Sequence, residues 1–408
     1  MNLYTYWKAG LGSVVLANLE FWNGFYRPLG GLFYLPIYAF AGMHAAPYRW
    51  AIFALLGLNA WQVYRLARGL GGSTRLAGFA CLFACVHGGM ADLVYSTSSV
   101  YDVLCVTFSL LTLILYVSGA SRVAVLASMI LAINAKEIAA TLPAFFLLYE
   151  LLFQPAKASR NAWFSFLALG FAAVAMYGKM HGADSMTANT EYRPIFTLAR
   201  WLEANVAYTG LIFYRPFVSA PVAIGVWIAM ALVAALTKSR MMMWALGFVL
   251  LVTIPISFIP RRLGGSLYLP LAGWAIWFGT FFDWLVALLP IRVMRGAASA
   301  AIAIGFTLWT AQGFAGQGDA LRHFQGTTRS VLASLERFPY RPPHGKRILI
   351  TGSPYHEVFD LVFLSNLFWN DRTLQIEDAN MAPDHGADWS RFEIVIGFKG
   401  EDLQLLKQ

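Results

Sequence analysis

The stretch Met129–Leu152, MILAINAKEIAATLPAFFLLYELL, places two adjacent charges, Lys136 and Glu137, inside an apolar run of membrane-spanning length. Ionisable residues at such depth are costly and usually functional. Neighbouring residues point about 100° apart on a helix, so this pair fits better at a turn between two short helices. We therefore expect a water-facing corner here. In the alternative interpretation, Lys136 reaches to a membrane interface and Glu137 satisfies a neighbouring helix.

The composition indicates a membrane protein. Of the 408 residues, 58% are hydrophobic and 12% are charged, and the mean hydropathy is +0.58. Lipid is the main solvent of such a chain, so we expect a polytopic membrane protein. The net charge of +9 lies mainly in short loops between apolar runs, which is the positive-inside pattern. We therefore expect no nucleic-acid partner.

The cysteines indicate neither a metal site nor a disulfide framework. Cys81, Cys85 and Cys105 sit inside apolar runs, with no paired spacing toward histidine. No basic segment followed by an apolar stretch and a small-residue cleavage site opens the sequence, so no signal peptide is visible.

The chain divides into four expected parts. Residues 1–46 mix aromatic residues with charges and prolines, which predicts interfacial helices on the external face. Residues 47–315 predict an all-α transmembrane bundle of about ten spans, several of them shorter than the roughly 20 residues that cross unaided. Residues 316–344 predict a helix and a linker, and residues 345–408 a small soluble α/β module. The expected spans are 47–66, 74–94, 99–118, 121–135, 138–153, 162–180, 219–237, 242–260, 267–289 and 297–315.

Within the C-terminal module, three apolar stretches have the length and composition of buried strands. They are KRILITGS, TLQIEDA and FEIVIGF, and the segment EVFDLVFLSNLFW between the first two predicts an amphipathic helix. The glycine that follows ILIT, Gly352, is too weak a signal for nucleotide binding, because no phosphate-loop spacing surrounds it.

The basic loops predict the orientation. In a ten-span scheme, most loop arginines and lysines fall on one side, which makes that side cytoplasmic. The opposite, external or periplasmic face then carries residues 1–46, the Lys136–Glu137 corner and the C-terminal module. Arg261 and Arg262 lie on that face although the positive-inside pattern places basic residues mainly on the cytoplasmic side. Because topology does not require them, they are candidates for binding an anion.

Four stretches occur in an order typical of one enzyme superfamily: FYRPLGGL (25–32), CVHGGMADLVYSTSSVYDVL (85–104), NAKEIAATLPAFFLLYEL (134–151) and SLYLPLAGWAI (266–276). With them the chain resembles, over roughly residues 25–290, the polyprenol-phosphate-sugar-dependent glycosyltransferases of the GT-C superfamily. The resemblance is to the transmembrane O-mannosyltransferases and their bacterial relatives. His87, Asp92 and Asp102 keep that branch's spacing, with Asp in place of Glu.

The resemblance implies a GT-C-like helical bundle in the inner or plasma membrane of the cell envelope. It implies an enzyme that moves a sugar from a polyprenyl-phosphate carrier to a glycan, lipid or protein acceptor on the external or periplasmic face. The implied lipid-phosphate-binding residues are Arg27, Arg261, Arg262 and Tyr268. Guanidinium groups suit an anionic phosphate at the membrane surface.

The implied catalytic residues are Glu20, Asp92, Asp102, Lys136 and Glu137. A carboxylate is needed to take the proton from the acceptor hydroxyl, and Lys136 would offset charge near the phosphate. Asp92 and Asp102 would serve the acceptor side or hold a divalent cation, or they are structural. The cofactor is undefined, since no ligand cluster of defined spacing marks a Mg²⁺ or Mn²⁺ site.

The sequence departs from the family pattern at two places. Gly264 and Gly265 stand where the family usually carries Glu-Arg, and Glu20 is the only acidic residue before Arg27. Family members have a first span and then an early acidic residue, which is taken as the catalytic base. We therefore expect either that the chain is incomplete at its N-terminus or that it has diverged into a weak or inactive form.

The sequence is also compatible with two other classes of protein. One is a transporter of lipid-linked saccharides, and the other is a non-catalytic membrane scaffold whose C-terminal module binds a partner. A transporter of this kind usually consists of two related halves with broken spans, and no such internal repeat is visible. A scaffold would tolerate the loss of Asp92, Asp102 and Lys136 together.

Overall fold

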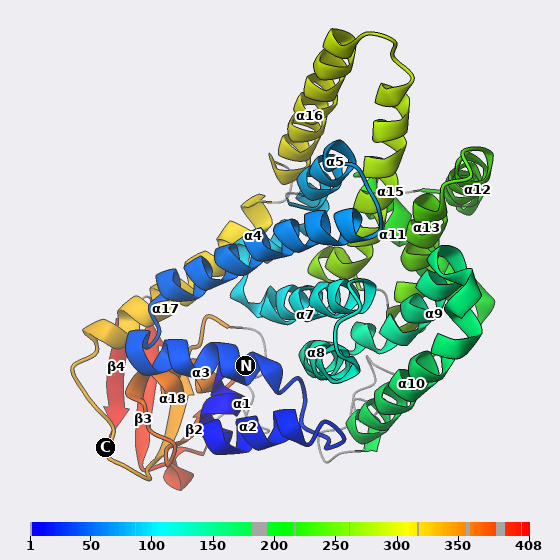
Figure 1. Ribbon diagram of the computed structural model, residues 1–408. Coiled ribbons are helices and arrows are strands. Elements are labelled where there is room, and N and C mark those ends of the chain that lie inside the picture. Colours follow the sequence, from blue (N-terminus) through cyan, green and yellow to red (C-terminus); the bar gives the residue numbers. More distant parts are fainter. Residues whose placement is uncertain are drawn as a thin grey trace. The chain divides into compact units, whose positions relative to one another are not determined.

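The computed structural model describes residues 2–85, 87–181, 194–215, 218–260, 262–315, 318–355, 360–380, 388–400 and 402–408 (Figure 1). The chain forms two compact units. The sheet unit comprises Met1–Val14, Gly31–Pro47 and Asp319–Gln408, and the helical unit comprises Val15–Gly30 and Tyr48–Gly318.

The chain is mostly helical. The longer helices that contribute to the helical unit are α4 (Ala45–Gly69), α5 (Thr74–Cys85), α7 (Val100–Val117), α8 (Arg122–Ala135), α9 (Leu142–Phe153), α10 (Ala158–His181), α11 (Leu198–Ile212), α12 (Ala220–Leu236), α13 (Arg240–Val252), α15 (Tyr268–Ala287) and α16 (Arg292–Ala315). Helix α2 (Leu11–Leu19) and the short helices α6 (Asp92–Tyr95) and α14 (Ile254–Ser257) complete the set. Side-chain caps explain several starts: Ser121 and Ser239 each accept a backbone N–H of the helix that follows.

Five helical segments in the described part of the chain are long and apolar enough to cross a membrane: Thr97–Val117, Pro155–His181, Arg240–Ser257, Gly264–Ala287 and Arg292–Ala315. Four shorter apolar helices accompany them, at Leu29–Ala41, Thr74–Cys85, Arg122–Ala135 and Ala220–Leu236. The predictions of a membrane protein and of a mainly helical fold agree with this result. Length and composition support five spans and do not establish about ten.

The expected span 74–94 ends early, at Cys85. Residues 87–99 form an irregular segment of two 3₁₀ turns and the short α6, and two glycines allow it to approach α16 closely. A side chain on Gly88 would lie 2.5 Å from the carbonyl carbon of Gly313 in α16, and one on Gly313 would lie 2.5 Å from the Tyr214 ring. The Gly88 N–H donates to the Tyr214 hydroxyl at 2.8 Å. The irregular segment is thus held directly against α16.

The sheet unit contains a four-stranded sheet in the order β2–β1–β3–β4, built from β1 (Arg347–Thr351), β2 (Gln375–Asp378), β3 (Ile394–Lys399) and β4 (Asp402–Lys407). Strand β1 is parallel to β2 and β3, and β4 is antiparallel to β3. The three predicted strands are confirmed. Strand β4 was not predicted, because LQLLK lacks a clear alternation; it lies at an edge with Leu405 and Leu406 exposed.

Helices complete the sheet unit: α1 (Asn2–Ala9), α3 (Leu29–Ala41), α17 (Gly318–Arg337) and α18 (Asp360–Trp369). The predicted helices GQGDALRHFQGTTRSVLASLERF (316–338) and EVFDLVFLSNLFW (357–369) correspond to α17 and α18. Val331 and Leu335 of α17 share one apolar core with Ile348, Ile350 and Ile396 of the sheet. Tyr4 of α1 stacks on Phe363 of α18, with ring centroids 4.5 Å apart, so N-terminal residues pack with the C-terminal module.

Candidate functional site

Lys136 and Glu137 mark a break between two helices, as the sequence predicts. Lys136 is extended (φ −160°, ψ 144°) at the end of α8, and Glu137 begins the 3₁₀ turn Glu137–Thr141. The expectation of a water-facing corner is wrong. Lys136 is 7% exposed and Glu137 is 6% exposed, because partners from distant parts of the helical unit cover both.

The pair lines a pocket of about 180 Å³ within the helical unit. The lining residues are Arg27, Lys136, Glu137, Met176, Pro255, Ile256, Ile259, Arg262 and Ser266. Three of the side chains are cationic, and most of the others are apolar. The predicted phosphate-binding residues Arg27 and Arg262 therefore meet the predicted Lys136–Glu137 pair at one place.

Arg27 and Glu137 form a two-pronged ion pair. Arg27 Nε donates to Glu137 Oε1 at 3.3 Å, and Arg27 Nη2 donates to Glu137 Oε2 at 3.0 Å. The guanidinium also lies over the Tyr26 ring, 4.5 Å from its centroid. Arg27 has φ +50°, a left-handed conformation that non-glycine residues seldom adopt. These contacts hold the guanidinium plane in a fixed orientation.

The Glu137 carboxyl is ionised in this setting. Burial raises its pKa, but Coulombic attraction to Arg27 and Lys179, with the hydrogen bonds from Arg27, outweighs burial and lowers the pKa to about 2. Glu137 therefore carries a full negative charge among the cations around it.

Lys136 is paired with the first turn of α7. Its Nζ donates to Asp102 Oδ1 and, at 3.1 Å, to Ser266 Oγ. The structure thus brings two predicted catalytic residues into contact. Ser266 precedes α15 and was not singled out from the sequence, although it opens the SLYLPLAGWAI stretch.

Lys179 is a further buried cation near this site that sequence reasoning missed. It is 2% exposed, and its Nζ donates no hydrogen bond to any described residue. It lies one turn after Met176 on α10, and it interacts electrostatically with Glu137 and Arg27. In the sequence, Lys179 stands near the end of the apolar run 162–180. A lysine at such a position usually reaches to the membrane interface, so the sequence gives no sign that this one is buried.

Asp92 lies against Gly264 and Gly265. The Gly265 N–H donates to Asp92 Oδ2 at 2.8 Å, and side chains at Gly264 or Gly265 would lie within 3.0 Å of the same carboxylate. Asp92 Oδ1 is buried and accepts no hydrogen bond from the described residues. Burial raises the pKa of this carboxyl, although the Gly265 N–H opposes the shift. A carboxylate of this kind is a suitable proton acceptor.

His87 has a structural role. It is 3% exposed; its Nδ1 accepts the Gly89 N–H, and its Nε2 lies 3.1 Å from the Ile212 carbonyl oxygen. The ring stacks on Tyr214, with centroids 4.8 Å apart. Burial lowers the pKa of His87 to about 4, so the ring is neutral and donates from Nε2.

The remaining predicted residues lie elsewhere. Glu20 is half-buried just after α2 and does not line the pocket. Tyr268 is buried and hydrogen-bonded to the Asn59 side chain, which makes it part of the packing between α15 and α4. Arg261 lies outside the described residues. Among the described residues, no group of three His, Cys, Asp or Glu side chains could hold a metal ion.

Four cations surround the site, namely Arg27, Lys136, Lys179 and Arg262; Glu137 pairs with Arg27, and Asp102 pairs with Lys136. A buried cation is costly unless a negatively charged or hydrogen-bonding group lies beside it. Comparison of the chain with protein-family models, with curated proteins and with solved structures finds no match.

Proposed function

We propose that the protein is an integral-membrane glycosyltransferase that moves a sugar from a polyprenyl-phosphate carrier to a glycan, lipid or protein acceptor. One observation supports this proposal above all: three cationic side chains, Arg27, Arg262 and Lys136, line one small pocket of an apolar helical unit. A lipid-linked phosphate combines the charge and the apolar chain that such a setting accommodates.

Arg27 and Arg262 bind the phosphate in this proposal. Glu137 fixes the Arg27 guanidinium from one side, which reduces the freedom lost when an anion binds. Lys136 and Lys179 add positive charge that counts most when the phosphate leaves, since its charge then rises from one negative charge to two.

Asp92 is the proposed general base. The acceptor hydroxyl oxygen attacks the anomeric carbon, the bond from that carbon to the phosphate oxygen breaks, and Asp92 takes the hydroxyl proton. Its contact with Gly265, next to pocket-lining Ser266, supports this role. Asp102 positions Lys136. No step requires Glu20.

The membrane arrangement is part of the proposal. In this proposal α4, α5, α8, α9 and α12 join the five long helical segments in a bundle of about ten spans. The loop arginines favour an external or periplasmic position for the pocket and for the sheet unit, in an inner or plasma membrane.

The test is release of polyprenyl phosphate by the purified full chain in lipid nanodiscs, supplied with a panel of polyprenyl-phosphate-linked sugars. We expect release with at least one donor. Asp92→Asn and Lys136→Ala should each lower the rate about tenfold or more, which is roughly 1.4 kcal/mol of transition-state stabilisation. Asp283→Asn is the matched control, because Asp283 pairs with Arg75 at 2.5 Å and neither residue lines the pocket.

Two outcomes would overturn the proposal. The first is no release from any donor, and the second is equal turnover by the wild-type chain and by Asp92→Asn and Lys136→Ala. Movement of an intact lipid-linked sugar across a liposome membrane, without cleavage, would instead favour a transporter.

A further inference from the structure

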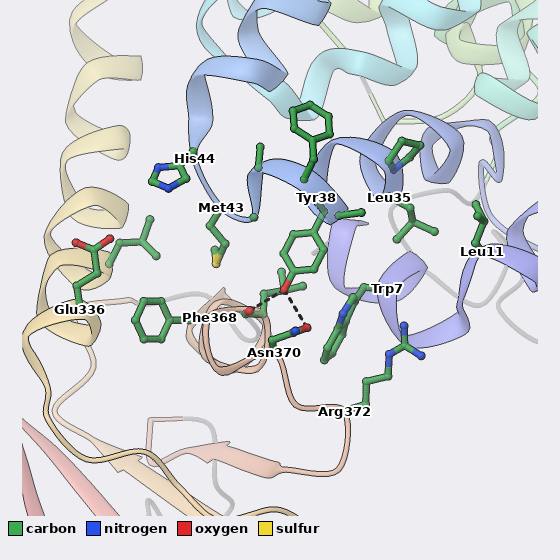
Figure 2. A pocket seen from close by; sticks show the side chains of 17 residues that line it. Trp7, Leu11, Leu35, Tyr38, Met43, His44, Glu336, Phe368, Asn370 and Arg372 are labelled. Carbon is green, nitrogen blue, oxygen red and sulfur yellow. Dashed lines mark hydrogen bonds between the residues drawn. The ribbon is translucent and has the colours of Figure 1, made fainter.

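The sheet unit contains a large cavity of its own, about 940 Å³ in volume (Figure 2). Four parts of the chain form its walls: residues at the α1–α2 junction, the second half of α3 with the turn to His44, α17, and the end of α18 with the turn after it. Its volume lies near the top of the roughly 300–1,000 Å³ typical of small-molecule sites. The cavity therefore has room for a ligand of several rings.

Aromatic side chains line much of this cavity. Trp7 is 5% exposed, whereas Phe40 is 74% exposed, and Tyr38 and Phe368 are partly buried. In Figure 2, Trp7, Tyr38 and Phe368 come from three different elements and lie around the same space. Such rings offer flat apolar faces to a ligand at low entropic cost.

Polar groups lie among these rings. The Tyr38 hydroxyl donates to the Leu367 carbonyl at 2.8 Å and approaches Asn370 Oδ1 at 3.4 Å. Asn370 has φ +52°, which a short amide side chain tolerates. Because its Oδ1 faces Tyr38, the Asn370 amide group retains N–H donors.

Two side chains of opposite charge complete the lining. Arg372 lies over the Trp7 ring, 5.1 Å from its centroid, and Figure 2 shows Glu336 on the far side of Phe368. Neither Arg372 nor Glu336 forms a salt bridge with another described residue. The cavity thus offers hydrogen-bond donors and acceptors and no single dominant charge.

This combination decides the ligand class. Asn370, Arg372 and Glu336 are exposed to solvent, and a bare lipid chain that covered them would desolvate them without offering a hydrogen-bond partner. An anion would face the Glu336 carboxylate. A sugar ring has an apolar C–H face for the aromatic rings and hydroxyl groups that both donate and accept, so it satisfies Asn370, Arg372 and Glu336 together.

We propose that this cavity binds a neutral oligosaccharide of two or more rings. The proposal of a sugar-binding site depends only on the residues that line the cavity. The further proposal that the bound sugar is a glycan acceptor rests on the proposed glycosyltransferase function.

The test is direct binding of neutral trisaccharides of glucose, mannose and N-acetylglucosamine to the full chain in nanodiscs, measured by calorimetry and by saturation-transfer NMR. No lipid-linked donor is present. We expect at least one trisaccharide to bind. Phe40→Ala, which removes a highly exposed ring and so spares the fold, and Arg372→Ala should each weaken binding at least fivefold. Lys399→Ala removes an exposed positive charge of the same unit outside the cavity, and it should bind normally.

Absence of binding by all three trisaccharides at millimolar concentration overturns this inference. So does binding that Phe40→Ala and Arg372→Ala leave unchanged, or a cavity that takes up a fatty acid or a peptide and no sugar. Trisaccharide binding without polyprenyl phosphate release would support the proposed binding site and overturn the proposed glycosyltransferase function. Polyprenyl phosphate release without trisaccharide binding would support the glycosyltransferase function and overturn the binding site.

Discussion

Glu137 is the residue around which the charges of the pocket are arranged. It accepts both hydrogen bonds of the Arg27 pair and lowers the electrostatic cost of burying Lys179. Removal of one member of a buried ion pair leaves the other charge uncompensated. The stability of the helical unit therefore depends on this carboxylate more than on any exposed one.

We expect Glu137→Ala to destabilise the protein by about 3 kcal/mol or more, because two buried cations lose their counter-charge. The matched control is Glu393→Ala, whose carboxylate is 47% exposed and pairs with Lys346 at 2.5 Å. An exposed pair of this type contributes at most about 1 kcal/mol. Thermal unfolding in detergent measures both variants. A shift for Glu137→Ala no larger than that for Glu393→Ala would contradict the expectation.

A second residue-scale prediction concerns the pH dependence of sugar transfer. Asp92 must be ionised to accept a proton, and burial raises its pKa above that of an ordinary aspartate. Activity should therefore be lost as the pH falls through this raised pKa, at a higher pH than an exposed carboxyl would give. The acid limb of kcat/KM against pH reports it, and Asp92→Asn should remove that limb. An acid limb that persists in Asp92→Asn assigns it to another group.

The residues of the site could be predicted from the sequence in part. Arg27, Lys136, Glu137 and Arg262 stand in motifs or against the charge bias, and they do meet. Lys179 could not be predicted, because a lysine near the end of an apolar helix usually reaches toward water. Its burial follows from tertiary packing alone.

At the scale of elements, Lys179 is buried because α10 packs closely against the Trp22 segment at one glycine, Gly178. A side chain at Gly178 would lie 1.8 Å from the Trp22 carbonyl oxygen, so the helix backbone touches the chain that leads to Arg27. Gly178 precedes Lys179 and thereby fixes where the ammonium lies. At Gly170, on the same helix, a methyl group would meet no neighbouring atom within 4 Å.

We expect Gly178→Ala to displace α10 from the Trp22 segment and to lower both the melting temperature and sugar transfer. Gly170→Ala is the matched control; it should be neutral or should stabilise the helix by up to about 1 kcal/mol, since alanine is the better helix former. Thermal unfolding and the release assay measure both. Equal behaviour of the two variants would show that α10 shifts freely.

Hydrophobic patterning predicted where most helices lie, but it predicted the residues at which they end less accurately. The expected span 99–118 matches α7 almost residue for residue, because Asp102 and the preceding serines mark its start and Gly119 its end. The expected span 74–94 overran by nine residues, since the apolar residues Met90 and Leu93 continue the composition while Gly88 and Gly89 break the helix. Helix α11 lies between the expected spans 162–180 and 219–237, where the sequence predicted no helix.

At the scale of the whole molecule, the sheet unit is assembled from both ends of the chain. Tyr4 on Phe363 and Tyr38 on Leu367 join residues more than 300 positions apart. No local pattern encodes such pairings, because they depend on tertiary contacts. The sequence alone could predict β1, β2 and β3 and the helices of this unit, but neither β4 nor the packing of α1 and α3 with them.

The orientation of the chain is open to a labelling test on a variant without native cysteines. The loop charges predict that a membrane-impermeant maleimide added from outside modifies Ser98→Cys and Lys399→Cys and spares Lys157→Cys and Arg240→Cys. All four native side chains are exposed, so accessibility in the folded protein does not limit the reaction. Modification of Lys399→Cys only after permeabilisation would reverse the topology and place the sheet unit inside the cell.

The contact between Gly88, Gly313 and Tyr214 also limits how this sequence can change over time. A methyl group added at either glycine would lie 2.5 Å from a neighbouring atom. A single substitution at either position would therefore displace that neighbour. A larger residue at one position becomes tolerable only after the opposite element has moved or the tyrosine has become smaller. Substitutions at these three positions should therefore arise together in diverging copies of the gene, and their joint change would trace this contact in an alignment.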